Sequence, residues 1–264
     1  MNQPQTAQLL NRDQPLDKLL QHSGHIWRAS NIDCGFQQGT PSGYALLDQH
    51  LPGSGWPTDG LTELLYGKAG IGEFRLLSPA LARLSRHQNR WLLWVAPPYI
   101  PYAPALVKAG IDLSRVLIVN PATDEDTLWV LETALASQSC SAVLAWPKKL
   151  KDKHLRRLQV ACKTGHCLGI LNRHFNAVHN SSPAELRIQL YADVPSPLSE
   201  HSCMKLKILK RKGGWATDLL TIELGDHLNQ ITPDFSELTV NNTSICDRPF
   251  TYIESSTINR HAIQ

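Results

Sequence analysis

Runs of consecutive apolar residues, separated by stretches with helical periodicity, constrain the fold of this chain more than any other feature. A strand that is apolar at every position is buried on both faces, as in a parallel sheet that helices cover. Alternation of such strands with helices is typical of parallel βαβ units. The sequence therefore predicts an α/β domain with a mainly parallel sheet flanked by helices. The expected strands are Leu61–Tyr66, Trp91–Ala96, Val116–Val119, Ala142–Trp146 and Cys167–Leu171, and the expected helices are Leu76–Gln88, Ala103–Ala109, Asp124–Gln138 and Asp152–Thr164.

The pattern changes at Pro195 and Pro197. Met204–Lys210 then alternates between apolar and basic residues and reaches a turn at Gly213 and Gly214, which predicts a C-terminal β-hairpin. Beyond this hairpin the composition is polar and has no period. The expected division is an N-terminal arm over residues 1–35, one domain over 36–228 and a flexible tail over 229–264.

A glycine-rich loop follows the first expected strand and has the spacing of a phosphate-binding loop without its charge. The phosphate-binding pattern is G-x-x-x-x-G-K-[ST], in which the Lys contacts phosphates and the hydroxyl contacts Mg²⁺. Gly67 and Gly72 keep the glycine positions, but Glu73 replaces the Lys and Phe74 replaces the Ser or Thr. A carboxylate about 4 Å from a phosphate charge costs roughly 4 kcal/mol at an effective dielectric near 20. We therefore expect a degenerate P-loop that binds no nucleotide or other cofactor, in a protein that is not an enzyme.

Pro79 falls inside the helix expected after this loop. A proline in a helix interior costs about 3 kcal/mol, whereas at the first helical position its missing N–H does no harm. We therefore expect Ser78 to cap the helix and Pro79 to begin it. Such a helix begins a turn too late to face a bound phosphate.

Composition excludes several classes of protein. The net charge is only +3, so any attraction to nucleic acid must come from local clusters. No apolar run reaches the ~20 residues of a membrane span, and the polar segment Met1–Gln14 is no secretory leader, so we expect a cytoplasmic protein. The 6 cysteines form no C-x-x-C pair. Cys162, His166 and Cys167 lack a fourth ligand at a recognisable spacing, so no metal site is expected.

Basic residues cluster between positions 148 and 163. Lys149, Lys153, Arg156 and Lys163 fall on one face of the expected helix, and Arg157 is the neighbour of Arg156 in sequence. Such side chains bind phosphates in a salt-sensitive manner that is independent of sequence. This face is therefore a candidate for binding DNA or an acidic partner. The alternative is an ordinary solvated helix face.

Aromatic residues mark further candidates for docking a partner. Tyr99 and Tyr102 lie in the proline-rich segment Pro97–Pro104, which is stiff enough to bind at low entropic cost. Trp27 is the apolar anchor of the N-terminal arm. The alternative for the proline-rich segment is a rigid loop packed on its own domain.

The order of motifs between Pro41 and Leu224 resembles the RecA core, through Pro41–Asp48, Gly55–Pro57, Ala109–Leu117 and Met204–Lys210. Where RecA-like ATPases carry a Mg²⁺-directing Asp and a catalytic Glu, this chain has Ala145–Pro147 and Ala96–Tyr99, which contain no carboxylate. The resemblance therefore implies a RecA-like fold without ATPase activity. It also implies further candidates for contact with DNA or a partner, one at the position of a nucleotide-sensing Gln and the others on the alternating strand: Arg173, Lys205, Lys207 and Lys210.

Within that superfamily the resemblance is strongest to ImuA, the RecA-like protein of bacterial mutagenesis cassettes. It is carried by Gly55–Pro57, Leu61–Leu64, Gly70–Glu73, Val95–Pro98, Pro101–Leu106 and Leu209–Gly214. It implies a non-catalytic adaptor of the SOS-induced mutasome, which supports error-prone translesion DNA synthesis and DNA repair. The implied partners are an ImuB-like protein and an error-prone polymerase, with RecA, DNA and a second copy of the chain as further contacts.

A second family, SulA, is similar over Leu61–Tyr191, including Pro79, Ala142–Trp146 and Leu186–Tyr191. This resemblance implies the alternative function, an SOS inhibitor of cell division that binds FtsZ. The hairpin at 204–224, the glycine loop and the segment Thr40–Pro57 favour ImuA.

Overall fold

The computed structural model describes residues 38–192, 203–224 and Tyr252–Ile253. The expected arm over 1–35, with Trp27, lies outside these residues, and so does the expected tail over 229–264 apart from Tyr252–Ile253. Among the described residues, no helix combines the length and the apolarity that a membrane crossing requires.

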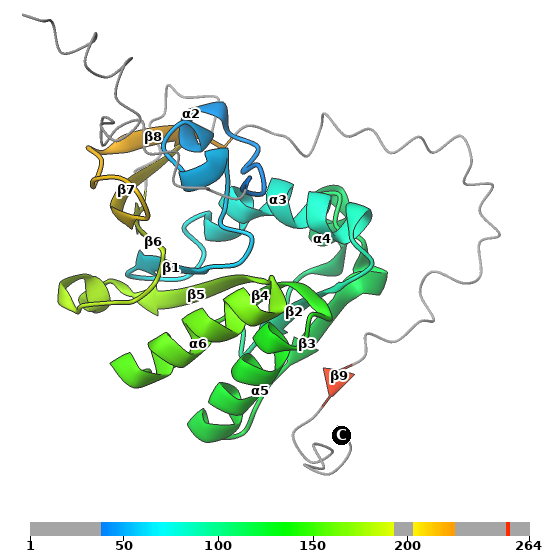
Figure 1. The fold of residues 1–264 in the computed structure, drawn as a ribbon. Coiled ribbons are helices and arrows are strands. Elements are labelled where there is room, and N and C mark those ends of the chain that lie inside the picture. The colour runs from blue at the N-terminus through cyan, green and yellow to red at the C-terminus, as the bar shows by residue number, and fades with distance from the viewer. Residues whose placement is uncertain (1–37, 193–202, 225–251, 254–264) are drawn as a thin grey trace, which may run out of the picture. The chain divides into compact units, whose positions relative to one another are not determined.

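A nine-stranded sheet organises the described chain (Figure 1). Its strand order is β8-β7-β6-β1-β5-β4-β2-β3-β9. β1 pairs in parallel with β5 and β6, and β2 pairs in parallel with β3 and β4, whereas β7 is antiparallel to β6 and β8. The mainly parallel sheet and the C-terminal hairpin expected from the sequence are therefore confirmed. The strands are β1 (Leu61–Tyr66), β2 (Trp91–Val95), β3 (Val116–Val119), β4 (Cys140–Ala145), β5 (Leu168–His174), β6 (Leu186–Tyr191), β7 (Cys203–Arg211), β8 (Leu220–Glu223) and β9 (Tyr252–Ile253).

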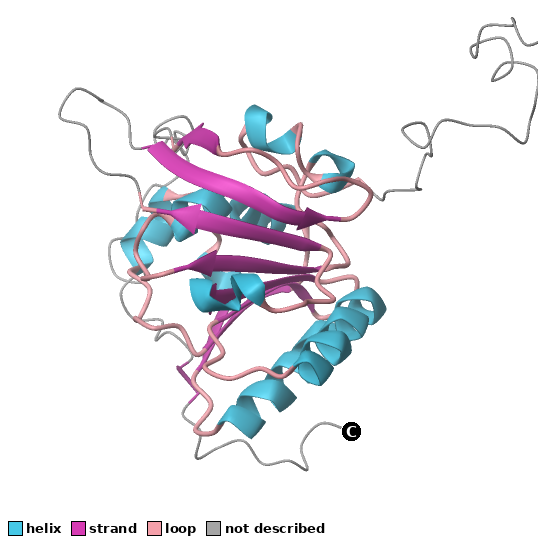
Figure 2. Cartoon of the chain, turned by 90° about the vertical axis from the view of Figure 1, so that its left-hand side faces the viewer, coloured by secondary structure: helices cyan, strands magenta, loops and turns pink. Residues whose placement is uncertain are grey.

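Helices cover both faces of this sheet, as Figures 1 and 2 show. Successive residues of a strand point to opposite faces, so Trp94 and Val95 of β2 belong to two different buried clusters. Leu76 of α3 shares the cluster of Trp94, and Leu131 of α5 and Leu155 of α6 share that of Val95. The helices are α2 (Ala45–Asp48), α3 (Glu73–His87), α4 (Ala103–Lys108), α5 (Asp124–Ala136) and α6 (Asp152–Gly165), with short 3₁₀ turns η2 (Pro52–Ser54), η3 (Leu113–Arg115) and η4 (Phe175–His179).

The expectation that Pro79 begins its helix is wrong. α3 begins at Glu73, directly after the glycine loop, and Pro79 lies in its interior. Pro79 has no N–H for the carbonyl of Arg75, four residues earlier. That carbonyl accepts hydrogen bonds from the hydroxyl groups of Tyr44, at 2.9 Å, and Ser78, at 3.0 Å. The helix continues through the proline because side-chain donors replace the missing backbone donor.

Candidate partner-docking site

The glycine loop between β1 and α3 is capped by its own side chain. One carboxylate oxygen of Glu73 accepts a hydrogen bond from the N–H of Gly70 at 2.8 Å, and the other accepts one from the N–H of Gly72 at 3.1 Å. Gly72 has a φ of 106°, which lets the chain turn from the loop into the helix. Glu73 is only 8% exposed. An anion that approached these amides would have to displace a buried carboxylate of like charge.

Aromatic side chains fill the space between this loop and the carboxyl ends of the central strands. The rings of Phe74 and Trp94 lie edge to face with centroids 5.6 Å apart, and those of Trp94 and Trp146 lie 6.3 Å apart. The indole N–H of Trp146 donates to the hydroxyl of Tyr66 at 3.1 Å. Burial, with the nearby charge of Glu73, raises the pKa of Tyr66 well above its ordinary value. Ligands of open parallel sheets usually bind at this edge, and here it is packed with protein side chains.

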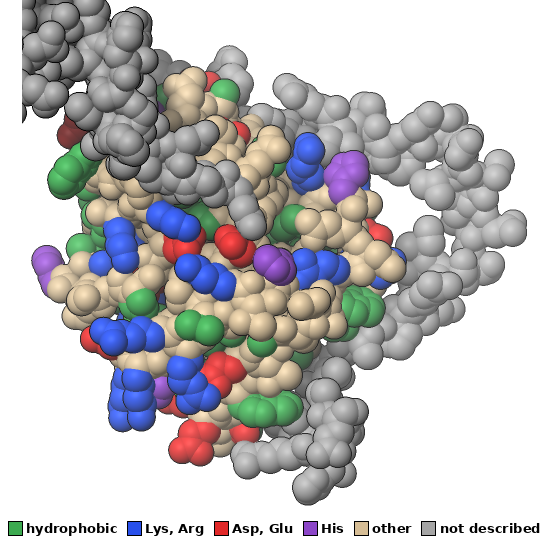
Figure 3. Space-filling view, in the orientation of Figure 1, with side chains coloured by type: hydrophobic (Ala, Val, Ile, Leu, Met, Phe, Trp, Pro, Cys, Tyr) green, Lys and Arg blue, Asp and Glu red, His purple; other side chains and the backbone are tan. Residues whose placement is uncertain are grey.

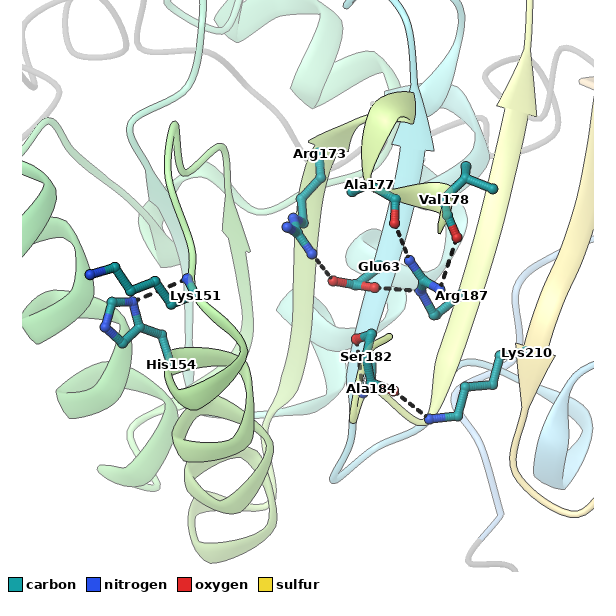
Figure 4. A network of polar contacts seen from close by, with 10 residues as sticks. All are labelled: Glu63, Lys151, His154, Arg173, Ala177, Val178, Ser182, Ala184, Arg187 and Lys210. Carbon is teal, nitrogen blue, oxygen red and sulfur yellow. Dashed lines mark hydrogen bonds and ion pairs between the residues drawn. The ribbon is translucent and has the colours of Figure 1, made fainter. Parts of the chain in front are cut away.

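Glu63 holds an ion cluster inside the sheet (Figure 4). Its carboxylate is fully buried on β1 and pairs with Arg173 of β5 and with Arg187 of β6, the latter at 2.6 Å. Arg187 also donates to the carbonyl of Ala177 in η4 at 2.7 Å, as Figure 4 shows. The side chain of Arg173 is 12% exposed. The structure thus places Arg173, a candidate for contacting DNA or a partner, in an internal ion pair.

The lysines expected on the alternating strand do lie on β7. Lys205 is exposed and Lys207 is partly buried. Lys210 donates to the carbonyl of Ser182 at 2.7 Å (Figure 4), and burial, followed by the charge of Arg187, lowers its pKa. These lysines lie on the hairpin side of the sheet. Glu185 lies 3.5 Å from Lys163 of α6 and 3.6 Å from Lys212 after β7, so this carboxylate is the point at which the two basic segments meet.

The basic residues of α6 and of the loop before it form an exposed surface, which we call the basic surface. Its members are Lys148, Lys149, Lys151, Lys153, Arg156, Arg157 and Lys163, all of them exposed. Figure 3 shows Lys and Arg side chains gathered over the face where α6 lies. Leu155, Leu158 and Cys162 of the same helix are buried, as their spacing indicates. The sequence therefore located this face correctly.

The two candidate tyrosines lie in a second exposed surface, which we call the aromatic surface and define as Tyr99, Ile100 and Tyr102. Tyr99 and Tyr102 are each 72% exposed, and Ile100 is 82% exposed. The alternative of a loop packed on its own domain does not fit these exposures.

Glu63 is the residue that sequence reasoning missed. A charged residue within the strand Leu61–Tyr66, which is otherwise mostly apolar, signals a buried ion pair, because an unpaired buried charge is very costly. Its partners Arg173 and Arg187 follow 110 and 124 residues later.

Comparisons with known proteins identify a family. The family model described as cell division inhibitor SulA matches residues 60–169. The SulA protein of Photorhabdus laumondii is 36% identical over 116 residues, which are 44% of this chain and 65% of that relative. SulA of Yersinia enterocolitica is 32% identical over 46% of this chain and 72% of its own length, and SulA of Yersinia pestis (strain Pestoides F) is 31% identical over 51% and 82%. The crystal structure of SulA from Pseudomonas aeruginosa matches 43% of this chain and 97% of its own, at 26% identity and a TM-score of 0.37.

These matches overturn the function expected from the ImuA resemblance. The family model is described as a cell division inhibitor, and the curated relatives carry the same name. The interpretation as a translesion-synthesis adaptor is therefore wrong. The partners tied to it, an ImuB-like protein and an error-prone polymerase, are unsupported as well. The findings support the alternative that the sequence offered through its likeness to SulA.

Proposed function

This chain belongs to the SulA family, and from that premise we propose that it inhibits cell division by binding FtsZ. The observation that carries the proposal is the match to curated cell division inhibitors over up to 82% of a relative's length. The residues matched by the family model, 60–169, extend from the start of β1 into β5 and include both α4 and α6. The shared activity should therefore reside on this part of the chain. We further propose that the protein acts in the cytoplasm during the SOS response to DNA damage.

The action we propose is binding without catalysis. Glu73 occupies the amides of Gly70 and Gly72, and Phe74 packs against Trp94, so the positions of the phosphate-binding Lys and the Mg²⁺-binding hydroxyl of a P-loop hold an acid and an aromatic ring. This supports the interpretation of Gly67–Phe74 as a degenerate P-loop.

The aromatic surface is the docking site that we propose for FtsZ. Exposed aromatic and aliphatic side chains gathered in one place mark protein-binding surfaces, and Tyr residues often dominate their binding energy. Tyr99, Ile100 and Tyr102 lie within the family match, and the preceding prolines Pro97 and Pro98 limit the entropy lost on binding. Trp215 is more exposed still, at 88%, but it lies in the hairpin outside that match.

Cell length on induced expression tests this proposal. The full chain should convert dividing bacteria into filaments without FtsZ rings, and the double variant Tyr99→Ala, Tyr102→Ala should lose this effect at equal protein level. Trp215→Ala is the matched control, because it removes an exposed aromatic side chain outside the family match and should leave filamentation intact. Normal division with the wild-type chain present would contradict the function. Filamentation by the double variant would contradict the site alone.

A further inference from the structure

Most charges of the basic surface have no ion-pair partner among the described residues. Within the described chain, Arg157 pairs with Glu132 at 2.5 Å and Lys163 lies 3.5 Å from Glu185, and the other members of the surface have no ion-pair partner. Like charges three or four residues apart on a helix repel one another, as Lys153, Arg156 and Arg157 do. Lys153 lies in the first turn of α6, where the positive end of the helix dipole disfavours a cation. Such an arrangement disfavours the isolated fold and favours an anionic partner.

His154 of α6 lies among these cations. Its pKa is lowered by partial burial and then by the charges of Lys153, Lys151 and Arg157, while Glu132 of α5 acts in the opposite direction. Asp152 is the one acidic residue between 148 and 163.

The basic surface begins beside the aromatic surface. β4 and β2 are neighbours with Ala145 opposite Val95, and the N–H of Trp146 donates to the carbonyl of Val95 at 3.1 Å. The chain leaves β4 towards Lys148 and leaves β2 towards Tyr99, so the first residues of the two surfaces lie at the same edge of the sheet. Beyond this edge α4 and α6 cover opposite faces, since Leu106 and Leu155 belong to different buried clusters. An apolar centre with charged residues at its border is the anatomy of a protein–protein interface.

This adjacency decides the kind of partner. A surface that binds single-stranded nucleic acid interleaves aromatic rings with its cations. Here the two are separate, because segment 148–163 contains no Trp, Tyr or Phe, and the segment 97–104 that carries Tyr99 and Tyr102 contains no Lys or Arg. A rim of exposed cations beside an apolar centre fits an acidic protein surface better. We propose that the basic surface attracts and orients an acidic patch of FtsZ while the aromatic surface anchors it. This inference rests on the proposed function. It adds that the surface of FtsZ bound here is acidic and that the cations control the rate of association.

Rim charges act mainly on the rate of association, whereas buried anchors act on dissociation. The double variant Lys153→Glu, Arg156→Glu should therefore bind purified FtsZ with an association rate about tenfold lower at low ionic strength, and with a weaker dependence on salt. Its dissociation rate should stay within about twofold of wild type.

The matched control is Arg83→Glu, Arg86→Glu, which makes the same change in net charge on exposed residues of α3, on the opposite face of the sheet. It should alter the association rate by less than about twofold, and circular dichroism should show both variants folded. Equal slowing by both variants would overturn the inference and leave the proposed function standing. The inference would also be overturned if Lys153→Glu, Arg156→Glu left the association rate with FtsZ unchanged, or if this variant lost only the ability to bind a duplex oligonucleotide. Absence of any FtsZ binding by the wild-type chain would overturn both proposals.

Discussion

The hydroxyl group of Tyr44 donates a hydrogen bond to the backbone carbonyl of Arg75, 2.9 Å away, in the turn of α3 that precedes Pro79. The segment that carries Tyr44 also packs on the proline itself, since a Cβ added to Gly43 would lie 2.5 Å from the Cβ of Pro79. The segment before the sheet thus supplies both the donor and the space that allow a proline inside this helix.

Replacing Tyr44 by Phe should lower the free energy of unfolding by about 1–2 kcal/mol, since it removes one donor from the carbonyl of Arg75, which keeps its bond from Ser78. In a Pro79→Ala background the loss should be smaller, because the backbone N–H that the substitution introduces can bond to that carbonyl. Urea unfolding of the two single variants and the double variant measures this coupling. An equal loss in both backgrounds would show that the Tyr44 bond does not compensate for the proline.

Replacing Glu63 by Gln should destabilise the protein by ~3–5 kcal/mol, because two largely buried guanidinium groups then lose their counter-charge. The control is Glu132→Gln, which removes the partner of Arg157, a residue whose side chain is 63% exposed. That exposed pair should contribute less than about 1 kcal/mol. Comparable losses for the two variants in chemical unfolding would argue against a buried ion cluster.

Stability should fall as the pH rises above about 9. Burial raises the pKa of Cys162 from 9.0 to about 12 and that of Cys140 to about 11. Between the unfolded and the folded pKa values, the unfolded thiols release protons that the folded thiols retain. The contribution of the buried thiols to the free energy of unfolding is therefore complete below pH 9 and is lost as the pH rises towards 12. Urea midpoints at a series of alkaline pH values should decline, and less steeply for Cys162→Ala. A flat profile would mean that the thiols are accessible to solvent in the folded protein.

Replacing Glu73 by Ala should lower stability by about 1 kcal/mol, because it leaves the loop N–H groups of Gly70 and Gly72 without their acceptor. Adding Mg²⁺ and ATP to the wild-type chain should leave its melting temperature unchanged, because the carboxylate already occupies the amides. A concentration-dependent rise in melting temperature would indicate a working nucleotide site.

The sequence predicted what depends on local pattern and missed what depends on distant residues. Continuous apolar runs located the parallel strands because a buried strand is recognisable from its own residues. The predicted start of α3 was wrong because Tyr44, whose hydroxyl group replaces the backbone donor that Pro79 lacks, lies 31 residues before Arg75. Arg173 was a candidate for external contact through the resemblance to RecA, and nothing in its local sequence indicates its ion-pair partner, Glu63 on β1.

The choice between two related families failed for a similar reason. Three features favoured ImuA. The hairpin at 204–224 and the segment Thr40–Pro57 lie outside residues 60–169, which match the SulA family model, whereas the glycine loop Gly67–Phe74 lies inside them and so does not distinguish the families. Inside that match the exposed face of α6 could be located from helical spacing, whereas the sequence left open whether Tyr99 and Tyr102 are exposed or packed on their own domain. The adjacency of the aromatic and basic surfaces follows from the pairing of β2 with β4, which sequence alone does not give.

The most direct test of inhibition through FtsZ is the amount of FtsZ polymer that sediments as purified chain is added. Sedimentable polymer should fall to near zero as the chain approaches equimolar concentration, and Tyr99→Ala, Tyr102→Ala should restore it while Trp215→Ala does not. Polymer that is unaffected by an excess of folded wild-type chain would contradict the proposed function.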